Sequence, residues 1–261
     1  MLERPDAATA AALARLYDLD LLEDPGDLVL YRALADRADG AVLELAAGTG
    51  RITVPLAAAG HSVTAVDNDA AMLDRARRRA NADGVGDRIE FLEADMVDVR
   101  LDGAGRHRLA FIALNSIMVL PTRDGQRAAF RTLAAHLAPG GLAVVDAWLP
   151  DGDDLARFDG RVILEWPRTD PESGAVVTKT GSAQHDAATG TVTLTAVYEV
   201  GRQGESPVRW VRRDRLRLIS PDEMTAFAED AGLDVEILAG GYDLSPLGPG
   251  SERAVLVAVR R

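Results

Sequence analysis

The stretch VLELAAGTGRIT, residues 42–53, joins an apolar segment to a turn of small residues. Val42, Leu43 and Leu45 predict a buried strand, and residues 46–50 predict a turn that leads into a helix. A turn of this composition lets a ligand approach backbone N–H groups at a helix N-terminus, where partial positive charge favours an anionic group. The stretch therefore predicts a strand, a ligand-binding turn and a helix in succession.

Strands and helices alternate after this turn. Further strands are predicted at residues 62–66, 88–92, 109–114 and 142–148, with helices at about 51–59, 70–82 and 123–138. A helix that begins at the capping box of residues 220–223 and strands at 234–238 and 254–260 continue the pattern. Because helical crossovers connect parallel strands, we predict an α/β fold with a doubly wound, mostly parallel, seven-stranded Rossmann-like sheet.

Two regions depart from this alternation. Residues 151–219 contain four segments rich in Val, Thr, Tyr and Trp with no helix between them, which predict an antiparallel β insertion. Residues 1–40 contain two helical patterns, which we expect to form an N-terminal helical cap. The α/β core would then comprise residues 41–150 and 220–261.

The composition excludes several classes of function. The 261 residues include 41 Asp and Glu against 29 Lys and Arg, a net charge of −12, which disfavours nucleic acids and anionic membranes as partners. The absence of cysteine excludes disulfides, thiolate nucleophiles and cysteine metal sites. No basic and apolar leader and no long apolar run is present, so we expect a soluble, cytoplasmic protein.

A nicotinamide or flavin site is one alternative for the turn, because G-x-G also occurs in dinucleotide-binding proteins. The dinucleotide fingerprint needs a third glycine, and Thr53 stands at that position after Gly48 and Gly50. This difference weakens the dinucleotide interpretation.

Polar side chains lie at the carboxyl ends of the first four predicted strands. Glu44, Asp67, Asp95 and Asn115 each follow or close one of the first four strands. Ligands of an open parallel sheet bind beyond the carboxyl ends of its strands, so we expect these four side chains to converge on one ligand.

The turn, these acids at matched spacing and the segment LAPGGLAVVDAW, residues 137–148, together resemble class I S-adenosylmethionine-dependent methyltransferases. The resemblance implies S-adenosyl-L-methionine as cofactor and S-adenosyl-L-homocysteine as product. It implies that Asp67 accepts hydrogen bonds from the ribose hydroxyls and that Asp95 accepts one from the adenine amine. The negative charge of Glu44 would repel a phosphate and attract the ammonium group of the methionine tail, directly or through water. The cofactor-binding residues implied in this way are Tyr17, Glu44, Ala46, Gly48, Gly50, Arg51, Asp67, Asn68, Met72, Asp95, Met96 and Asn115.

Ala46 differs from the family pattern, which usually has glycine at this position. Because alanine is strained in the left-handed region, we predict a negative φ for Ala46.

The activity implied by the resemblance is methyl transfer to a nitrogen or an oxygen of a small molecule by in-line displacement, an EC 2.1.1 reaction that requires no metal. The tail and insertion are similar to a bacterial subgroup that includes N-methyltransferases of amino sugars and of glycine type. An oxygen acceptor needs a general base, whereas an amine only has to arrive neutral. The catalytic candidates are Asn115, Tyr242 and His185, although turn positions explain the first two and a surface strand position explains the third.

Several alternatives stay open at the level of sequence. The insertion either covers the acceptor or forms a homodimer contact. Three aromatic side chains either line an acceptor pocket or belong to the core: Trp148, Tyr198 and Trp210. We expect His107 to be exposed in a polar turn.

The main functional alternative is a non-catalytic cofactor-binding or partner-binding subunit with this fold. A nucleic-acid methyltransferase is disfavoured, because residues 115–118 read NSIM in place of an Asn/Asp-Pro-Pro-aromatic motif.

Overall fold

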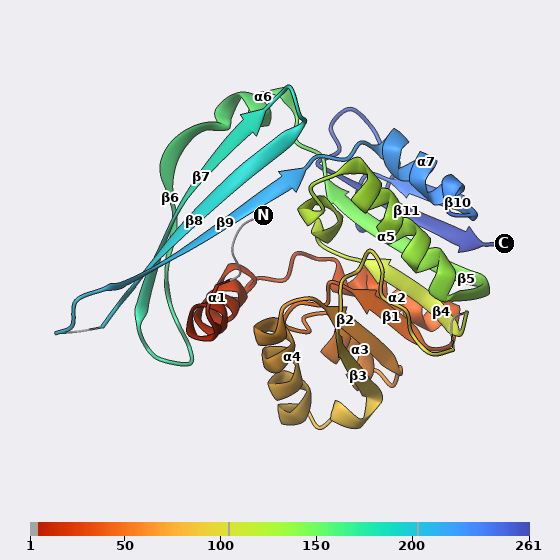
Figure 1. Ribbon diagram of the computed structural model, residues 1–261, viewed down its shortest axis with the longest axis horizontal. Coiled ribbons are helices and arrows are strands. Elements are labelled where there is room, and N and C mark those ends of the chain that lie inside the picture. The colour runs from red at the N-terminus through yellow and green to blue at the C-terminus, as the bar shows by residue number, and fades with distance from the viewer. Residues whose placement is uncertain (1–4, 104, 203) are drawn as a thin grey trace. The chain divides into compact units, whose positions relative to one another are not determined.

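The computed structural model describes residues 5–103, 105–202 and 204–261, and the chain divides into two compact units (Figure 1). The core unit comprises Asp24–Leu149 and Ile219–Arg261. The insertion unit comprises Pro150–Leu218 together with the N-terminal segment up to Glu23.

The core unit contains a seven-stranded sheet, as predicted. In sheet order the strands are β10 (Leu233–Ala239), β11 (Arg253–Arg260), β5 (Leu137–Trp148), β4 (His107–Ile112), β1 (Val42–Leu45), β2 (Val63–Asp67) and β3 (Ile89–Glu93). The five strands from β5 to β3 pair in parallel, and β11 pairs antiparallel with both β5 and β10. The fold is therefore a mixed, mostly parallel Rossmann-like α/β sheet.

Helices cover this sheet in two groups. The helices of the core unit are α2 (Leu28–Ala38), α3 (Thr53–Ala58), α4 (Ala70–Ala82), α5 (Arg123–His136) and α7 (Pro221–Asp230), with 3-10 turns η1 (Gly86–Arg88) and η2 (Ser116–Val119). The helices α5 and α7 pack together near β4, β5, β10 and β11, whereas α3 and α4 pack against β2 and β3 (Figure 1). The predicted capping box at the start of α7 is present, since Ser220 and Glu223 bond reciprocally.

The sheet is buried because its strands are apolar. Every residue of β1 is buried, and so are five of the six residues of β4. The ring of Tyr31 on α2 packs against Phe111 on β4 with the ring centroids 4.4 Å apart. Burial of such a side chain stabilises the fold by about 2 kcal/mol.

The boundary between α5 and β5 differs from the prediction. The helix ends at His136 and the strand begins at Leu137, before the Pro-Gly-Gly sequence that we expected to separate them. Leu137 is already aligned with His107 in the sheet, and a Cβ at Gly141 would lie 3.1 Å from the His107 carbonyl oxygen. The glycine therefore lets the strand pass close to its neighbour.

The insertion unit contains the predicted antiparallel sheet. Its strands in order are β6 (Asp159–Thr169), β7 (Val176–Asp186), β8 (Thr191–Gly201) and β9 (Val208–Arg217). A short helix, α6 (Gly152–Arg157), precedes them, and its six residues have too little apolar periodicity to be predicted.

The two N-terminal helices belong to different units. The helix α1 (Ala7–Asp20) buries Leu16 and Leu19 against Val177 and Tyr198 of the insertion sheet. The helix α2 instead joins the apolar cluster of the core unit. A single N-terminal helical cap is therefore not confirmed.

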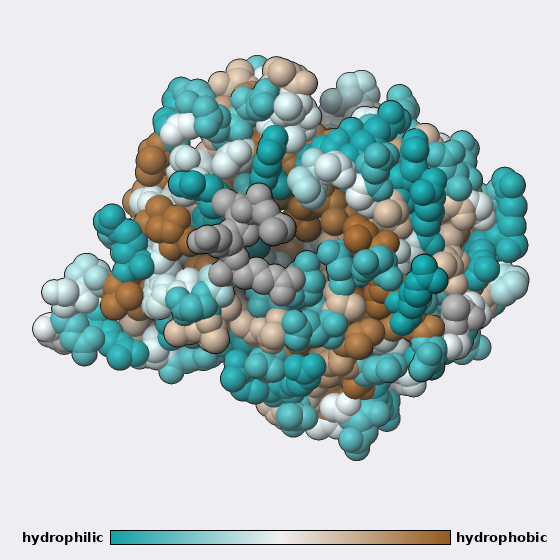
Figure 2. Space-filling model, viewed as in Figure 1, coloured by the Kyte–Doolittle hydropathy of each residue, from teal (hydrophilic) through white to brown (hydrophobic). Residues whose placement is uncertain are grey.

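The edge strand β6 exposes apolar side chains. Val162, Ile163 and Leu164 are 70%, 54% and 63% exposed, and Figure 2 shows hydrophobic surface over the region where Figure 1 places β6. Among the helices of the described residues, none is long and apolar enough to cross a membrane.

Candidate functional site

The turn after β1 folds back on itself. The Ala47 N–H donates to the Val66 carbonyl of β2 at 2.9 Å, and the Gly50 N–H donates to the Ala47 carbonyl at 3.0 Å. Gly48 and Gly50 have φ angles of 56° and 77°. A Cβ at Gly50 would also lie only 3.0 Å from the Cβ of Ala76. Position 50 therefore requires glycine, both because its φ is positive and because a side chain would collide with Ala76.

The prediction for Ala46 was wrong. Its φ is 59°, in the left-handed region, because the chain must reverse between the end of β1 and the hydrogen bond that Ala47 makes to β2. Alanine has the smallest side chain after glycine, and the conformation costs about 1 kcal/mol.

Asp67 at the end of β2 is fixed to this turn. One carboxylate oxygen accepts the Gly48 N–H at 2.8 Å, and the other accepts the Asp69 N–H at 2.9 Å. Burial raises the pKa of Asp67, while the hydrogen bonds from Asp69 and Gly48 act in the opposite direction. The predicted acid and the predicted turn therefore meet, and Asp67 keeps lone pairs for further donors.

The next strand end lies beside Asp67. The Ala94 N–H after β3 donates to the Asp67 carbonyl at 3.0 Å, which brings the following residues to this edge of the sheet. Asp95 is exposed and its carboxylate accepts the Val97 N–H at 3.1 Å, whereas Met96 is buried. Of the other two residues implied after β2, Asn68 is exposed and Met72 is buried in α4.

Glu44 is almost completely buried at the end of β1. It accepts a short hydrogen bond from the Thr53 hydroxyl at the start of α3. Burial raises the pKa of Glu44 to about 8, against the lowering effects of the Thr53 hydrogen bond and the Arg51 charge. In the free protein the Glu44 carboxyl therefore holds a proton at neutral pH.

Arg51 has a partner that the sequence did not reveal. Its guanidinium makes two hydrogen bonds of 2.6 Å to the carboxylate of Asp27, which is fully buried at the start of α2. A bidentate pair of this kind fixes the guanidinium plane. Asp27 lies 24 residues before Arg51 in a turn without a recognisable motif, so no sequence signal identified the pair.

Asp146 on β5 is a second buried carboxylate that the sequence analysis missed. It accepts hydrogen bonds from the Tyr31 hydroxyl at 2.6 Å, the Leu114 N–H at 2.9 Å, the Tyr242 hydroxyl at 3.0 Å and an Arg253 N–H at 2.6 Å. Burial raises its pKa, opposed chiefly by the Tyr31 hydrogen bond and the Arg253 charge. An acid inside the apolar run VVDAW was the available signal, since buried carboxylates need partners.

This carboxylate holds the segment after β4. Leu114 and Asn115 have φ angles of 49° and 66°, and the Asn115 side-chain oxygen accepts the Trp148 N–H at 2.6 Å. Asn115 thus links the ends of β4 and β5. Tyr242 donates to Asp146, and burial together with that charge raises the pKa of its phenol, which disfavours a phenolate base. The structure brings these two candidates together around Asp146.

The remaining candidates belong to the insertion unit. Tyr17 on α1 lies beneath the guanidinium of Arg212, which is 5.4 Å from its ring centroid. His185 on β7 is half-buried, and its backbone N–H donates to the Phe158 carbonyl. The cofactor contact of Tyr17 and the catalytic role of His185 stay predictions.

The expectation of an exposed His107 was wrong. The side chain is fully buried on β4, with Nδ1 3.2 Å from the His136 carbonyl and Nε2 3.3 Å from the Thr64 hydroxyl. Burial lowers its pKa to about 4, so the imidazole is neutral in the folded protein. The strand begins at His107, earlier than its polar neighbours suggested, which explains the difference.

Comparison with known proteins agrees with this geometry. Residues 42–141 match the family model described as a methyltransferase domain. The chain is 27% identical over 253 residues to the cypemycin N-terminal methyltransferase of Streptomyces sp, with 94% of each chain covered. Its structure is similar to that of the CcbJ methyltransferase from Streptomyces caelestis, with a TM-score of 0.76, 26% identity, and 92% of this chain and 97% of CcbJ covered. It is also similar in fold to CalS10, an amino pentose methyltransferase from Micromonospora echinaspora with S-adenosylmethionine bound, with a TM-score of 0.65, 22% identity, and 100% and 99% covered.

Proposed function

We propose that the chain, which contains a methyltransferase domain and resembles class I S-adenosylmethionine-dependent methyltransferases, methylates an amine nitrogen of a small molecule. This proposal rests on the hydrogen bonds that already engage two of the catalytic candidates, Asn115 and Tyr242. Asn115 accepts the Trp148 N–H and Tyr242 donates to Asp146, so neither is placed to remove a proton. A neutral amine needs no general base, whereas a hydroxyl does.

The residues of the turn fit the cofactor. The backbone at Gly48 and Gly50 is free of side chains, and Asp67 is held with lone pairs to spare. The cofactor supplies an electrophilic methyl group on a sulfonium. In the roles that the resemblance implies, Asp67 accepts from the ribose hydroxyls and Asp95 from the adenine amine. We assign Glu44 to the ammonium group of the methionine tail.

The chain contributes chiefly binding, alignment and exclusion of water. The lone pair of the acceptor nitrogen forms the new C–N bond while the C–S bond breaks and its electrons stay on sulfur. The product ammonium then loses a proton to water. Within this scheme, the Asp146 hydrogen bonds position residues 114–115 beside the reacting groups.

The test is an assay of S-adenosylhomocysteine release over a panel of amines, amino sugars and phenols. Turnover of amines, retained in Tyr242→Phe and His185→Gln, is the expected result. Turnover of phenols alone, or loss of amine turnover in both variants with the fold intact, would overturn the proposal for nitrogen. Homodimerisation through the insertion stays a prediction for separate measurement.

A further inference from the structure

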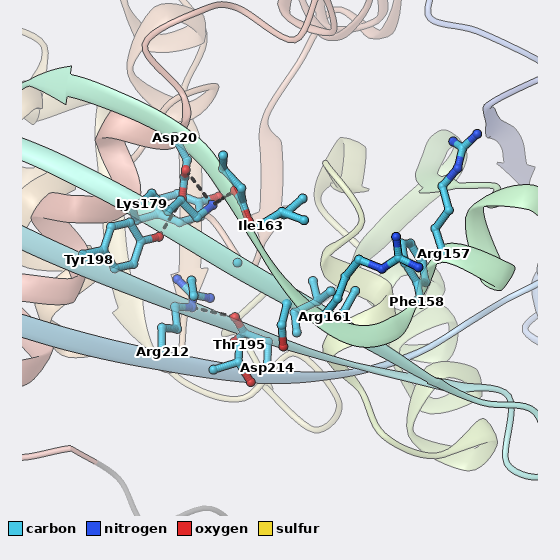
Figure 3. Close-up of a pocket in the computed structure, with 17 residues that line it drawn as sticks. Asp20, Arg157, Phe158, Arg161, Ile163, Lys179, Thr195, Tyr198, Arg212 and Asp214 are labelled. Carbon is cyan, nitrogen blue, oxygen red and sulfur yellow. Dashed lines mark hydrogen bonds and ion pairs between the residues drawn. The ribbon is translucent and has the colours of Figure 1, made fainter.

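The insertion unit contains a cavity of about 580 Å³ on the face of its sheet that carries α1 (Figure 3). This volume suits a small-molecule ligand. A cross-strand row of Ile163, Gly181, Ala196 and Arg212 runs across its floor, one residue from each strand. The small residues at the centre of this row leave the space that the cavity occupies.

Charged groups close one end of the cavity. Asp20 on α1 accepts hydrogen bonds from the Lys179 ammonium at 2.8 Å, the Tyr198 hydroxyl at 2.7 Å and the Trp166 indole N–H at 3.0 Å. Lys179 also pairs with Glu165 at 2.8 Å. Figure 3 shows Asp20, Lys179 and Tyr198 together at this end, and Arg157, Phe158 and Arg161 at the other.

The enclosed part of the cavity is acidic. Three carboxylates with exposed fractions of 22–33% line it, whereas the two cations that line it at similar depth are Lys179 and Arg212. The carboxylates are Asp20, Glu165 and Asp214. Arg157 and Arg161 also line the cavity, but they are 74% and 67% exposed and pair with Asp154 and Asp159. The inner groups therefore leave one negative charge uncompensated.

Glu165 has capacity for a further donor. Its Oε2 pairs with Lys179. Its Oε1 lies over Gly181, so that a Cβ added to Gly181 would lie only 1.7 Å from this oxygen. Across the residues that the structure describes, Lys179 alone is paired with Glu165. A carboxylate has about four acceptor sites, so Oε1 can receive a ligand N–H on the side away from Lys179.

We propose that this cavity binds a cationic amine with an apolar body, and that the Glu165 carboxylate holds its ammonium group. Ile163, Leu194 and the small residues of the floor contact the apolar body. This site lies within the insertion unit alone and goes beyond the proposed function, because the nitrogen that accepts the methyl group must be neutral and an ammonium has no lone pair.

Calorimetric titration of the full chain with hexylamine, hexanoate and hexanol tests the charge requirement, because the three probes share one apolar body. We expect hexylamine to bind more tightly than hexanol and hexanoate to bind most weakly. Glu165→Gln should weaken hexylamine binding about tenfold or more without changing hexanol binding. The matched control is Glu199→Gln, on β8 but outside the cavity, which should change neither.

Tighter binding of hexanoate would assign the cavity to an anion held by Arg157 and Arg161, and would overturn the proposal. Unchanged hexylamine binding in Glu165→Gln would also overturn it. Ala196→Leu fills the floor and should abolish binding of all three probes, with thermal unfolding used to confirm that the variant folds. Titration with S-adenosylhomocysteine separates the two proposals, because failure of the cavity leaves cofactor binding and amine turnover intact.

Discussion

The two candidate sites, the turn after β1 in the core unit and the cavity of the insertion unit, hold their carboxylates in different ways. In the turn of the core unit, Asp67 accepts the backbone N–H groups of Gly48 and Asp69. In the insertion unit, the carboxylates that line the cavity accept from side chains. A site held by backbone groups keeps its geometry when surrounding side chains change, whereas a site made of side chains changes with each substitution. The comparison therefore predicts a fixed geometry for the turn that we propose binds the methyl donor, and an adaptable geometry for the cavity that we propose binds a cationic amine.

The largest expected effect is at Asp146. Asp146→Ala removes the common acceptor of Tyr31, Tyr242 and Arg253 and should lower the free energy of unfolding by about 3 kcal/mol. Urea unfolding measures this loss. A change below about 1 kcal/mol would show that the buried network does not hold the core unit.

The donor site is tested at Asp67. Asp67→Ala should weaken S-adenosylhomocysteine binding about a hundredfold, because it removes the carboxylate that we propose accepts two hydrogen bonds from the ribose. Calorimetry gives the affinity, and circular dichroism shows whether the fold persists. Asp74→Ala, on the exposed face of α4, is the control. Unchanged affinity would mean that the ribose is placed incorrectly.

The raised pKa of Glu44 predicts a dependence of binding on pH. The cofactor ammonium prefers the ionised carboxylate, so affinity for S-adenosylhomocysteine should rise up to about tenfold per pH unit between pH 6 and 7.5, below the Glu44 pKa of about 8. Glu44→Gln should flatten this profile. A profile that is equally steep in the variant would exclude Glu44 as its source.

The same pKa has the opposite consequence for the stability of the free protein. The folded state holds the Glu44 proton up to about pH 8, whereas the unfolded carboxyl loses it near pH 4.5. Its contribution to stability is therefore fully present below pH 4.5 and is lost as pH rises to about 8.

The insertion unit should tolerate change better than the core unit. Lys179→Gln breaks ion pairs with Asp20 and Glu165, but both acids reach solvent, so the loss of stability should be about 1 kcal/mol. The same urea measurement used for Asp146 provides the comparison. A loss as large as that of Asp146→Ala would remove the distinction between the two units.

The smallest effect is expected at Ala46. Ala46→Gly relieves the strain of a φ of 59° but increases the freedom of the unfolded chain, and a net gain of about 0.5 kcal/mol remains. A loss of stability in thermal unfolding would show that the Ala46 methyl group packs favourably.

The sequence was sufficient for features that depend on local pattern. The alternation of strands and helices and the placement of Asp67 beside Gly48 followed from strand ends in a parallel sheet. Pairs that join distant segments were not predictable, since Tyr31 and Asp146 are 115 residues apart. The cavity depends on the register that aligns Ile163 with Gly181, which no single strand encodes. The error at Ala46 arose because a tertiary hydrogen bond outweighed a local preference.

Transfer of a 13C-labelled methyl group from S-adenosylmethionine shows which atom of the acceptor receives the methyl group. The full chain is incubated with an equimolar mixture of apolar amines and phenols, and the methylated products are identified by NMR. We predict label on nitrogen, as N-methyl resonances, and a transfer rate about a hundredfold lower for Asp67→Ala when the cofactor is not saturating. Label on oxygen, or no transfer to any amine by a protein that binds the cofactor, would contradict this prediction.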